Sequence, residues 1–280
     1  AKLYSKLDEY SRALDAELEK GRQIQKDFLP RELPHLSGWD IAACFHPARQ
    51  VSGDFYDGFL LPNGWLAVVI GDVCDKGIGS ALFMALIRSL LRVFTGKISL
   101  SGISISSGGR TVSGEVDSEV ETALGAVSST NEYIAHEHGD QGMFATLCLG
   151  VINPQTGLLA YVNAGHLPLA IIGQRGVRSF LSATGSSVGI DPVSSYRSAI
   201  ARIEPGEVLI GYTDGVTEAM SPDEILYTKE RFYSLLEKPV SSALDLIERV
   251  KADLFHHIRH APQSDDITMI AVHRQEPAGE

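Results

Sequence analysis

Residues 55–73 read FYDGFLLPNGWLAVVIGDV, two apolar runs separated by a short polar turn. The runs, Phe55–Leu61 and Trp65–Val73, have the length and the apolar or alternating pattern of β-strands. The segment Pro62-Asn63-Gly64 between them is typical of a hairpin turn. This stretch therefore predicts a pair of antiparallel strands.

Strand patterns recur on both sides of this hairpin, with helical patterns inserted between them. The further strand patterns are Trp39–Phe45, Phe144–Ile152, Leu158–Asn163, Leu167–Ile172, Glu207–Tyr212 and Ile267–His273. Helical patterns occupy Ser80–Phe94, Glu119–His138 and Ala243–Ile258. Strands in hairpin-like succession with paired helices between them predict an α+β fold with antiparallel sheets rather than a βαβ winding.

The first thirty residues predict a helix, which Pro30 and Pro34 end. Leu3, Leu7, Tyr10 and Leu14 follow the 4-3-4 spacing of a coiled-coil seam, which Glu17 and Gly21 interrupt and Ile24 and Phe28 resume. Two interpretations stay open. The helix either lies on its own domain, or it is a signalling helix that dimerises the protein and passes input to the domain behind it.

The predicted organisation is a linker helix over residues 1–30 and one domain over residues 31–275. Residues 95–118 contain many serines and glycines and few large apolar groups, which predicts a flexible insertion, either a lid or a plain disordered segment. The chain begins with Ala1 inside a helical pattern. We therefore expect that it is cut from a longer protein, in which a sensor or membrane segment could precede it.

Composition argues against two kinds of partner. The 280 residues include 24 basic and 35 acidic side chains, a net charge of −11, whereas nucleic-acid binding requires lysine and arginine to neutralise phosphates. No apolar run has the length of a membrane-spanning helix.

Cys44, Cys74 and Cys148 lie in apolar stretches without metal-ligand spacing, a pattern typical of free thiols in a reducing compartment. We expect a cytoplasmic domain, whose acidity reflects either an ordinary soluble surface or a carboxylate cluster that holds cations.

Four segments place aspartates at the ends of apolar strands or in glycine-containing turns. They are Gly53-Asp54-Phe55-Tyr56-Asp57, Gly71-Asp72-Val73-Cys74-Asp75-Lys76-Gly77, Tyr212-Thr213-Asp214-Gly215 and Ser264-Asp265-Asp266-Ile267-Thr268. A single aspartate at a strand end is usually a turn-former that caps backbone amides. Four such segments beside buried strands predict carboxylates that converge at one rim, where their repulsion requires cations.

The residue types predict which cation and which chemistry. Oxygen ligands without histidine or cysteine favour Mg²⁺ or Mn²⁺ over Zn²⁺. Two such ions about 3.5–4 Å apart can hold a phosphate and activate water for in-line attack. The pattern therefore predicts metal-assisted hydrolysis that needs no nucleophilic side chain.

The aspartate segments also resemble a known family. Gly53–Asp57, Gly71–Gly77, Asn163-Ala164-Gly165-His166, Tyr212–Glu218 and Asp265–Thr268, in this order, look like the RsbU/SpoIIE branch of the bacterial PPM (type-2C) metal-dependent serine/threonine phosphatases. The resemblance covers about residues 24–274, including Ile24-Gln25 and Phe28-Leu29-Pro30. It implies a β-sandwich of two antiparallel sheets flanked by helices, which agrees with the strand pattern.

The resemblance implies ligands for two Mg²⁺ or Mn²⁺ ions. Asp72 would bridge the ions, and the backbone carbonyl of Val73 would bind one of them. Asp214 and Asp265 would complete the other ion's shell, and Asp54 would act on a metal directly or through water. Asp72 and Asp214 would thereby carry catalysis through a metal-bound water. The supporting candidates are Asp57 and Asp75, for a weaker ion or for capping, and Asp266, for a position outside the direct ligands.

Three further residues each have two interpretations. Arg49 stands where animal relatives carry a phosphate-binding arginine, whose guanidinium fork suits a phosphate dianion; otherwise it is a surface arginine paired with a carboxylate. Lys76 is a phosphate contact or a solvated lysine in a turn. His166 is a general acid for the leaving serine oxygen, or a residue held by backbone hydrogen bonds.

The resemblance implies a phosphoserine or phosphothreonine protein phosphatase in bacterial signalling, whose substrate is a phosphorylated STAS-like anti-anti-sigma protein. Because helix Ser80–Phe94 directly follows the Asp72 turn, we expect the N-terminal helix to bias that helix by dimerising or rotating. Two other functions stay open. A pseudophosphatase would have lost metal aspartates, and a two-metal hydrolase of small phosphates or nucleotides is disfavoured by the lack of a G-x-x-x-x-G-K-[ST] loop.

Overall fold

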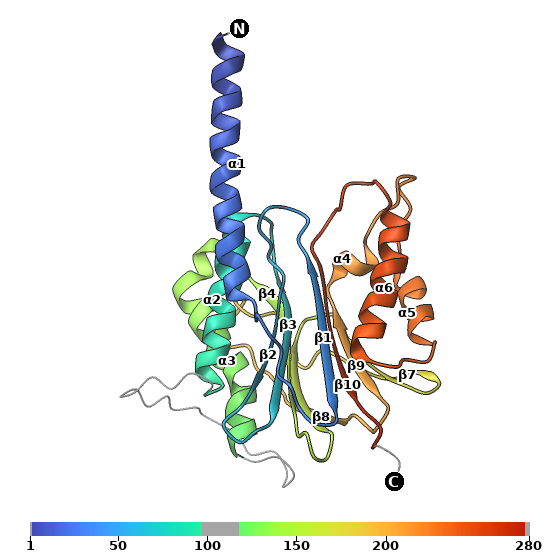
Figure 1. The fold of residues 1–280 in the computed structure, drawn as a ribbon. Coiled ribbons are helices and arrows are strands. Elements are labelled where there is room, and N and C mark those ends of the chain that lie inside the picture. The colour runs from blue at the N-terminus through green and yellow to red at the C-terminus, as the bar shows by residue number, and fades with distance from the viewer. Residues whose placement is uncertain (1, 97–117, 278–280) are drawn as a thin grey trace.

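The computed structural model describes residues 2–96 and 118–277, which form two five-stranded antiparallel sheets packed face to face (Figure 1). The first sheet has the order β1 (Trp39–His46), β10 (Ile267–Arg274), β9 (Val208–Tyr212), β6 (Leu169–Gly173) and β7 (Gly176–Leu181). The second has the order β2 (Phe55–Leu60), β3 (Leu66–Val73), β4 (Ala145–Ile152), β5 (Leu158–Ala164) and β8 (Ala199–Arg202). The predicted sandwich is confirmed.

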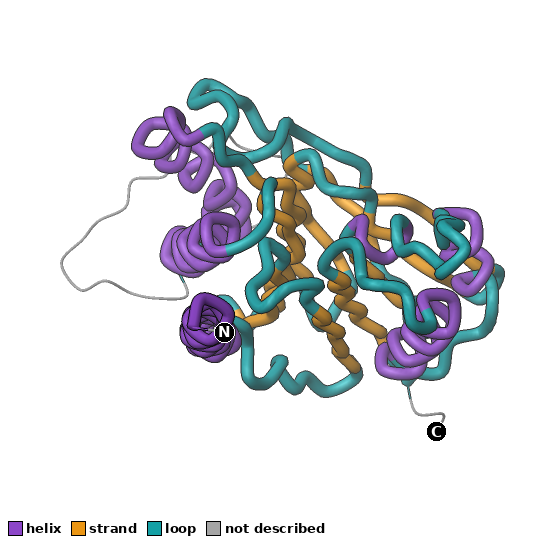
Figure 2. The backbone as a smooth tube through the Cα atoms, turned by 90° about the horizontal axis from the view of Figure 1, so that it is seen from above, coloured by secondary structure: helices purple, strands orange, loops and turns teal. Residues whose placement is uncertain are grey.

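Helices cover the outer face of each sheet, so the domain has four layers (Figure 2). The second sheet carries α2 (Ile78–Phe94) and α3 (Ser118–His138), followed by the short 3-10 helix η1 (Gly139–Gln141). The first sheet carries α6 (Ala243–Ile258), α5 (Lys229–Leu236) and the one-turn α4 (Asp214–Thr217). A sheet buried on both faces explains why several strands are apolar along their whole length.

The alternation of side chains along each strand determines which residues face the other sheet. Leu66, Val68 and Ile70 of β3 pack in the core between the sheets, whereas Val69 and Val73 pack under the helices. Because successive side chains of a strand point to opposite faces, the same alternation turns the next even-numbered residue of β3 towards the sandwich interior. That residue is Asp72, at the end of the strand.

The N-terminal helix α1 (Lys2–Phe28) begins far from the sheets and meets them only near its C-terminal end (Figure 1). There Gln25 donates to the carbonyl of Ser52 at 2.6 Å and accepts from the backbone N–H of Ser52 at 3.0 Å. Further out, Leu7 and Tyr10 are 66% and 75% exposed. Within residues 2–96 and 118–277, no helix is both long and apolar enough to cross a membrane.

The predicted elements are present with shifts of one or two residues at their ends, and the β2–β3 hairpin turns at Gly64 with a φ of 82°. Strands β7 and β8 and helices α4 and α5 were not predicted. The insertion expected at residues 95–118 lies outside the described residues apart from its ends. Cys44, Cys74 and Cys148 are all free, and the first and last are buried.

A buried ionic cluster fastens α2 to β2. Asp57 is 1% exposed and accepts two hydrogen bonds of 2.7 Å from Arg92, while Nε of Arg88 lies 3.0 Å from its carboxylate. The guanidinium of Arg92 also lies over the ring of Phe59, 5.0 Å from its centre. The Asp57 carboxylate therefore faces α2, on the side of the sheet opposite to the sandwich interior.

Replacing Asp57 by asparagine is expected to lower the free energy of unfolding by about 3–5 kcal/mol, because two largely buried guanidinium groups lose their counter-charge. Asp27 provides the matched control, since it pairs with Arg31 at 2.9 Å with both side chains exposed. Asp27→Asn is expected to change the free energy by about 0.5 kcal/mol or less. Chemical denaturation of both variants measures the difference, and equal effects would contradict the role of the buried cluster.

Candidate metal centre

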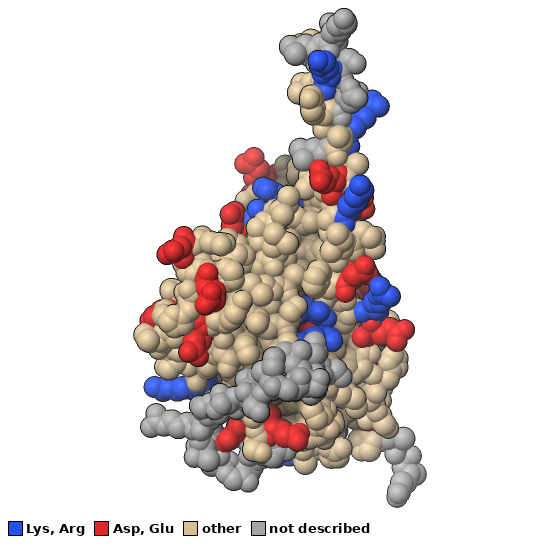
Figure 3. Space-filling model, turned by 90° about the vertical axis from the view of Figure 1, so that its left-hand side faces the viewer, with Lys and Arg blue, Asp and Glu red and all other residues tan. Residues whose placement is uncertain are grey.

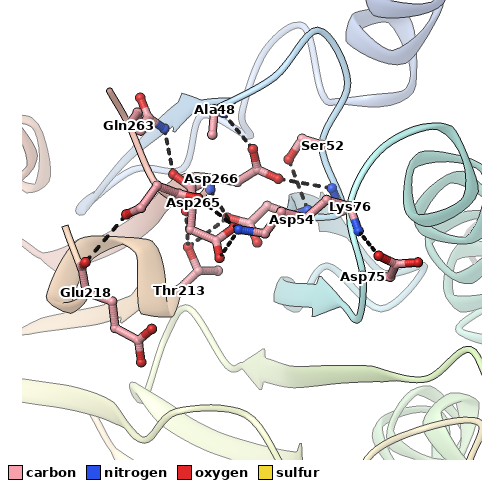
Figure 4. Close-up of polar contacts among 12 residues, drawn as sticks. Ala48, Ser52, Asp54, Asp75, Lys76, Thr213, Glu218, Gln263, Asp265 and Asp266 are labelled. Atoms are coloured by element: carbon pink, nitrogen blue, oxygen red, sulfur yellow. Dashed lines mark hydrogen bonds and ion pairs between the residues drawn. The ribbon is translucent and has the colours of Figure 1, made fainter. Parts of the chain in front are cut away.

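Four loops meet at one end of the sandwich and bring the predicted aspartates together. The antiparallel registers put the start of β2 beside the end of β3, and the start of β10 beside the end of β9. These strand ends carry Asp54, Asp72, Asp214 and Asp265. Figure 4 shows Asp54, Asp265 and Asp266 gathered where the loops meet.

Asp54 ties the two sheets to each other. Its carboxylate is 2% exposed and accepts a hydrogen bond of 2.7 Å from the hydroxyl of Thr213, at the end of β9. The same hydroxyl accepts from the backbone N–H of Thr268 in β10 at 3.0 Å. Burial, and then the charge of Asp72, raise the pKa of Asp54 well above its ordinary value.

Burial and the negative charge of neighbouring carboxylates also raise the pKa values of Asp72 and Asp214. Burial raises the pKa of Asp72 to about 7, and the charges of Asp214 and Asp265 add to the shift. The pKa of Asp214 is raised by burial and then by Asp265 and Glu218. Each shift means that the ionised form lacks compensating positive charge in its surroundings.

Two glycines allow the backbone to approach closely here. A β-carbon at Gly53 would lie 2.7 Å from the carbonyl oxygen of Val73, and one at Gly215 would collide with the carbonyl of Asp266. Gly53 thus lets the loop before Asp54 lie against the end of β3, and Gly215 lets α4 lie against the start of β10. The glycines beside the aspartates in the sequence serve this packing.

Lys76 supplies a positive charge inside the cluster. Its ammonium donates to Asp265 at 2.7 Å and to the backbone carbonyl of Ser264 at 2.8 Å (Figure 4). Asp265 thus has a cation beside it, and Asp54, Asp72 and Asp214 remain with raised pKa values. Lys76 is exposed, and its ammonium is engaged by Asp265, so both interpretations of this lysine stay predictions.

The remaining candidates, Asp266, Arg49 and Asp75, lie in the loops around this cluster. Asp266 accepts from the backbone N–H of Ala48 at 2.7 Å and of Gly53 at 3.2 Å, so it holds the β1–β2 loop. Arg49 is exposed on that loop and forms no ion pair with any described residue. Asp75 is exposed, has a φ of 68°, and accepts from the N–H of Lys76.

His166 is buried in the connection from β5 to β6, and its backbone N–H donates to Asn163 at 2.8 Å. Burial lowers the pKa of its imidazole to about 4, so the ring is neutral at neutral pH and has no ready proton for a leaving group. This environment favours the interpretation of a residue held by hydrogen bonds over that of a general acid.

The donor chemistry of the cluster fits divalent cations. Hard carboxylate oxygens that share a desolvated space and repel one another are the groups that Mg²⁺ or Mn²⁺ stabilises. Within the described ranges, no three His, Cys, Asp or Glu side chains already form a closed set of ligands around one point. The 2.7 Å ion pair engages one of the carboxylates that would otherwise face the cations.

The sequence analysis did not predict the hydroxyl-bearing residues that support the aspartates. Ser52 accepts from the backbone N–H of Asp54 at 3.1 Å, and Thr213 supports its carboxylate. Thr268 lies one strand period before Ile270, and Thr213 lies two periods after Leu209, and both of these apolar residues face the sandwich interior. Strand alternation was therefore the signal that could have found them.

Comparison with known proteins gives relatives along nearly the whole chain. Protein IcfG of Synechocystis sp. is 49% identical over 263 residues, which are 92% of this chain and 41% of IcfG. The phosphoserine phosphatase RsbU of Bacillus subtilis is 25% identical over 94% of this chain and 71% of its own length. The chain thus spans less than half the length of IcfG.

Solved structures agree with the fold. The SiaA-PP2C domain of Pseudomonas aeruginosa superposes with a TM-score of 0.74 at 19% identity, over 94% of this chain and 97% of that domain. RsbX in complex with magnesium superposes with a TM-score of 0.58 at 16% identity, over 86% and 98%. The sandwich is therefore that of a PP2C domain.

The family comparison covers most of both sheets and the helices between their strands. The Stage II sporulation protein E (SpoIIE) family matches residues 62–275, which include Asp72, Asp214 and Asp265. This match, with the identity to IcfG, shows that the chain belongs to the SpoIIE family.

Proposed function

We propose that this domain is a metal-dependent protein phosphatase that hydrolyses a phosphoserine or phosphothreonine ester of a partner protein. The observation that carries the proposal is the convergence of Asp54, Asp72 and Asp214 in a desolvated space where their carboxylate charge is uncompensated, with Asp265 beside them. Membership of the SpoIIE family and the similarity to the phosphoserine phosphatase RsbU support the same reaction.

Each residue has a proposed role around two divalent cations. Asp72 would be a ligand shared by the cations, the backbone carbonyl of Val73 would be a ligand of one, and Asp214 and Asp265 would be ligands of the other. Asp54 acts from the buried side, where the hydroxyl of Thr213 orients its carboxylate. When bound, Mg²⁺ or Mn²⁺ would neutralise the carboxylates, orient the phosphate and lower the pKa of the attacking water. The magnesium complex of the structural neighbour RsbX supports the choice of ion.

The protein itself offers one exposed side chain to the phosphate. Arg49 lies exposed on the loop that Asp266 holds, so its guanidinium is available to a phosphate dianion that approaches from solvent. Water attacks phosphorus, the ester P–O bond breaks, and the leaving serine or threonine oxygen takes up the proton that the attacking water gives up. Asp57 and Asp75 have supporting roles, the first in fastening α2 and the second in shaping the turn before it.

The substrate is a phosphorylated STAS-like regulatory protein, and the setting is a bacterial signalling pathway in the cytoplasm; both rest on the RsbU/SpoIIE resemblance. No nucleic-acid partner is proposed, because acidic and basic side chains are scattered over the helical face rather than gathered into a basic patch (Figure 3). The net charge of −11 supports the same conclusion.

The N-terminal helix is proposed to dimerise and to regulate the domain. Its exposed apolar residues Leu7 and Tyr10 support a helical partner. At its other end, α1 and α2 enclose an apolar groove of about 330 Å³, lined by Ile24, Ile78 and Leu82 among others. Because α2 directly follows the turn that carries Lys76, a shift of α1 is transmitted to the candidate metal centre.

Asp214→Asn is expected to reduce hydrolysis of an aryl phosphate in Mn²⁺ by at least about 100-fold, because a direct metal ligand loses its charge. EDTA is expected to abolish the activity of the unaltered chain. The control is Asp253→Asn, which removes a carboxylate of α6 that is bonded to Tyr227 and to Arg231 of α5 rather than to the aspartate cluster. Activity that survives EDTA, or an unaffected Asp214→Asn variant, would rule out the two-cation mechanism.

The metal-free protein is expected to lose stability as pH rises from about 4 to 7. Asp72 has a folded pKa of about 7, above its value of 3.8 in an unfolded chain, so the folded state binds more protons in this range. Its contribution to stability is therefore lost as pH rises, by about 1.4 kcal/mol per unit for one such group.

Thermal unfolding in EDTA at several pH values measures this loss, and Asp72→Asn is expected to flatten the profile. Added Mn²⁺ is expected to stabilise the protein more at pH 8 than at pH 5.5. A melting temperature that rises with pH in EDTA, in the same way for both chains, would contradict the raised pKa of Asp72.

A further inference from the structure

His166 contacts residues beside proposed ligands from both sheets, although it is not itself a proposed ligand. It lies where the chain crosses from β5 of one sheet to β6 of the other, and its side chain is buried, with the residue 4% exposed. Its Nδ1 is 2.9 Å from the hydroxyl oxygen of Thr146 in β4. The ring also interacts with the backbone of Tyr212 at the end of β9.

Thr146 is the cross-strand neighbour of Asp72. The β3–β4 register pairs these two residues directly. Residues paired directly across antiparallel strands have β-carbons about 4.5–5.5 Å apart and side chains on the same face. The partner of His166 on this side therefore stands beside the carboxylate proposed to bridge the cations. On the other side, Tyr212 is two residues before Asp214.

Asp54 provides a precedent within the same centre. Its carboxylate is oriented by the hydroxyl of Thr213, and that hydroxyl is itself fixed by the backbone N–H of Thr268. Thr146 is the strand neighbour of Asp72, as the register shows, and its hydroxyl lies 2.9 Å from His166 Nδ1, which fixes it. Because threonine is stiff at χ1, one hydrogen bond is enough to select its rotamer.

The second nitrogen of the His166 ring, Nε2, engages no other side chain in the part of the chain that the structure describes. Nε2 is buried and has no hydrogen-bond partner among the described residues, and the ring meets Tyr212 only through that residue's backbone, so Thr146 is the side chain that this imidazole engages. A neutral imidazole has one donor and one acceptor nitrogen, so it can either accept from or donate to the threonine hydroxyl. Packing alone would be served equally well by leucine, without a buried unsatisfied nitrogen.

We infer that His166 is a positioning residue, which fixes Thr146 and thereby holds Asp72 in the orientation that binds the cations. The inference rests on the proposed function and adds a residue to it. Removing such a support typically weakens metal binding by about 10–100-fold, although the support touches no metal. Thr146 and His166 act as one unit, so losing both costs no more metal affinity than losing either.

The test measures Mn²⁺ affinity by calorimetry, without substrate, for four variants. Thr146→Val removes the hydroxyl and keeps the shape, and His166→Leu removes both ring nitrogens. Both are expected to weaken Mn²⁺ binding by about tenfold or more, and the double variant by no more than either. His166→Asn keeps a polar atom near the position of Nδ1 and is expected to restore most of the affinity.

Melting temperatures of the same variants in EDTA separate positioning from packing. If Thr146→Val melts at a lower temperature but binds Mn²⁺ as tightly as the unaltered chain, or if His166→Asn binds no better than His166→Leu, the positioning role is wrong. A different outcome would contradict the proposed function itself: the unaltered chain binds no Mn²⁺, or Asp214→Asn binds it equally well. The proposed role of His166 would then be wrong as well.

Discussion

The repulsion among desolvated carboxylates at one end of the sandwich is the constraint on which the rest of the site depends. Asp54, Asp72 and Asp214 all have raised pKa values for the same two reasons, burial and one another's charge. A fold does not gain stability from such an arrangement. Its retention is explained if the carboxylates bind cations, and the single ammonium of Lys76 beside Asp265 offsets only part of the charge.

The architecture keeps these groups in place because their positions follow from strand alternation. The even-numbered residues of β3 fill the sandwich interior up to Ile70, and Asp72 continues that row at the rim. Hydroxyls from neighbouring strands then fix the carboxylates, as Thr213 does for Asp54. On the opposite face of the sheet, Asp57 and its two arginines fasten α2, the helix that starts directly after the site. Asp54, Asp72 and helix α2 are thus attached to the same sheet.

Much of this could be predicted from the sequence, and the rest could not for physical reasons. Long apolar strands and the hairpin at Pro62–Gly64 gave clear patterns, as did the aspartates beside glycines. Strand β8 was missed because two of its four residues are exposed, the other two are only partly buried, and the segment carries no apolar alternation. The engagement of Lys76 by Asp265, 189 residues away, and of Asp57 by arginines of α2 depends on tertiary contacts that no local pattern encodes. Thr146 was missed because a threonine in a strand is ordinarily a strand former.

The central claim is that these aspartates exist to hold two cations, and crystals grown with Mn²⁺ test it most directly. Anomalous diffraction at the manganese edge is predicted to give two peaks about 3.5–4 Å apart, with Asp72 between them and Asp214 on one. Manganese bound only elsewhere, or absent while Lys76 still pairs with Asp265, would contradict the account.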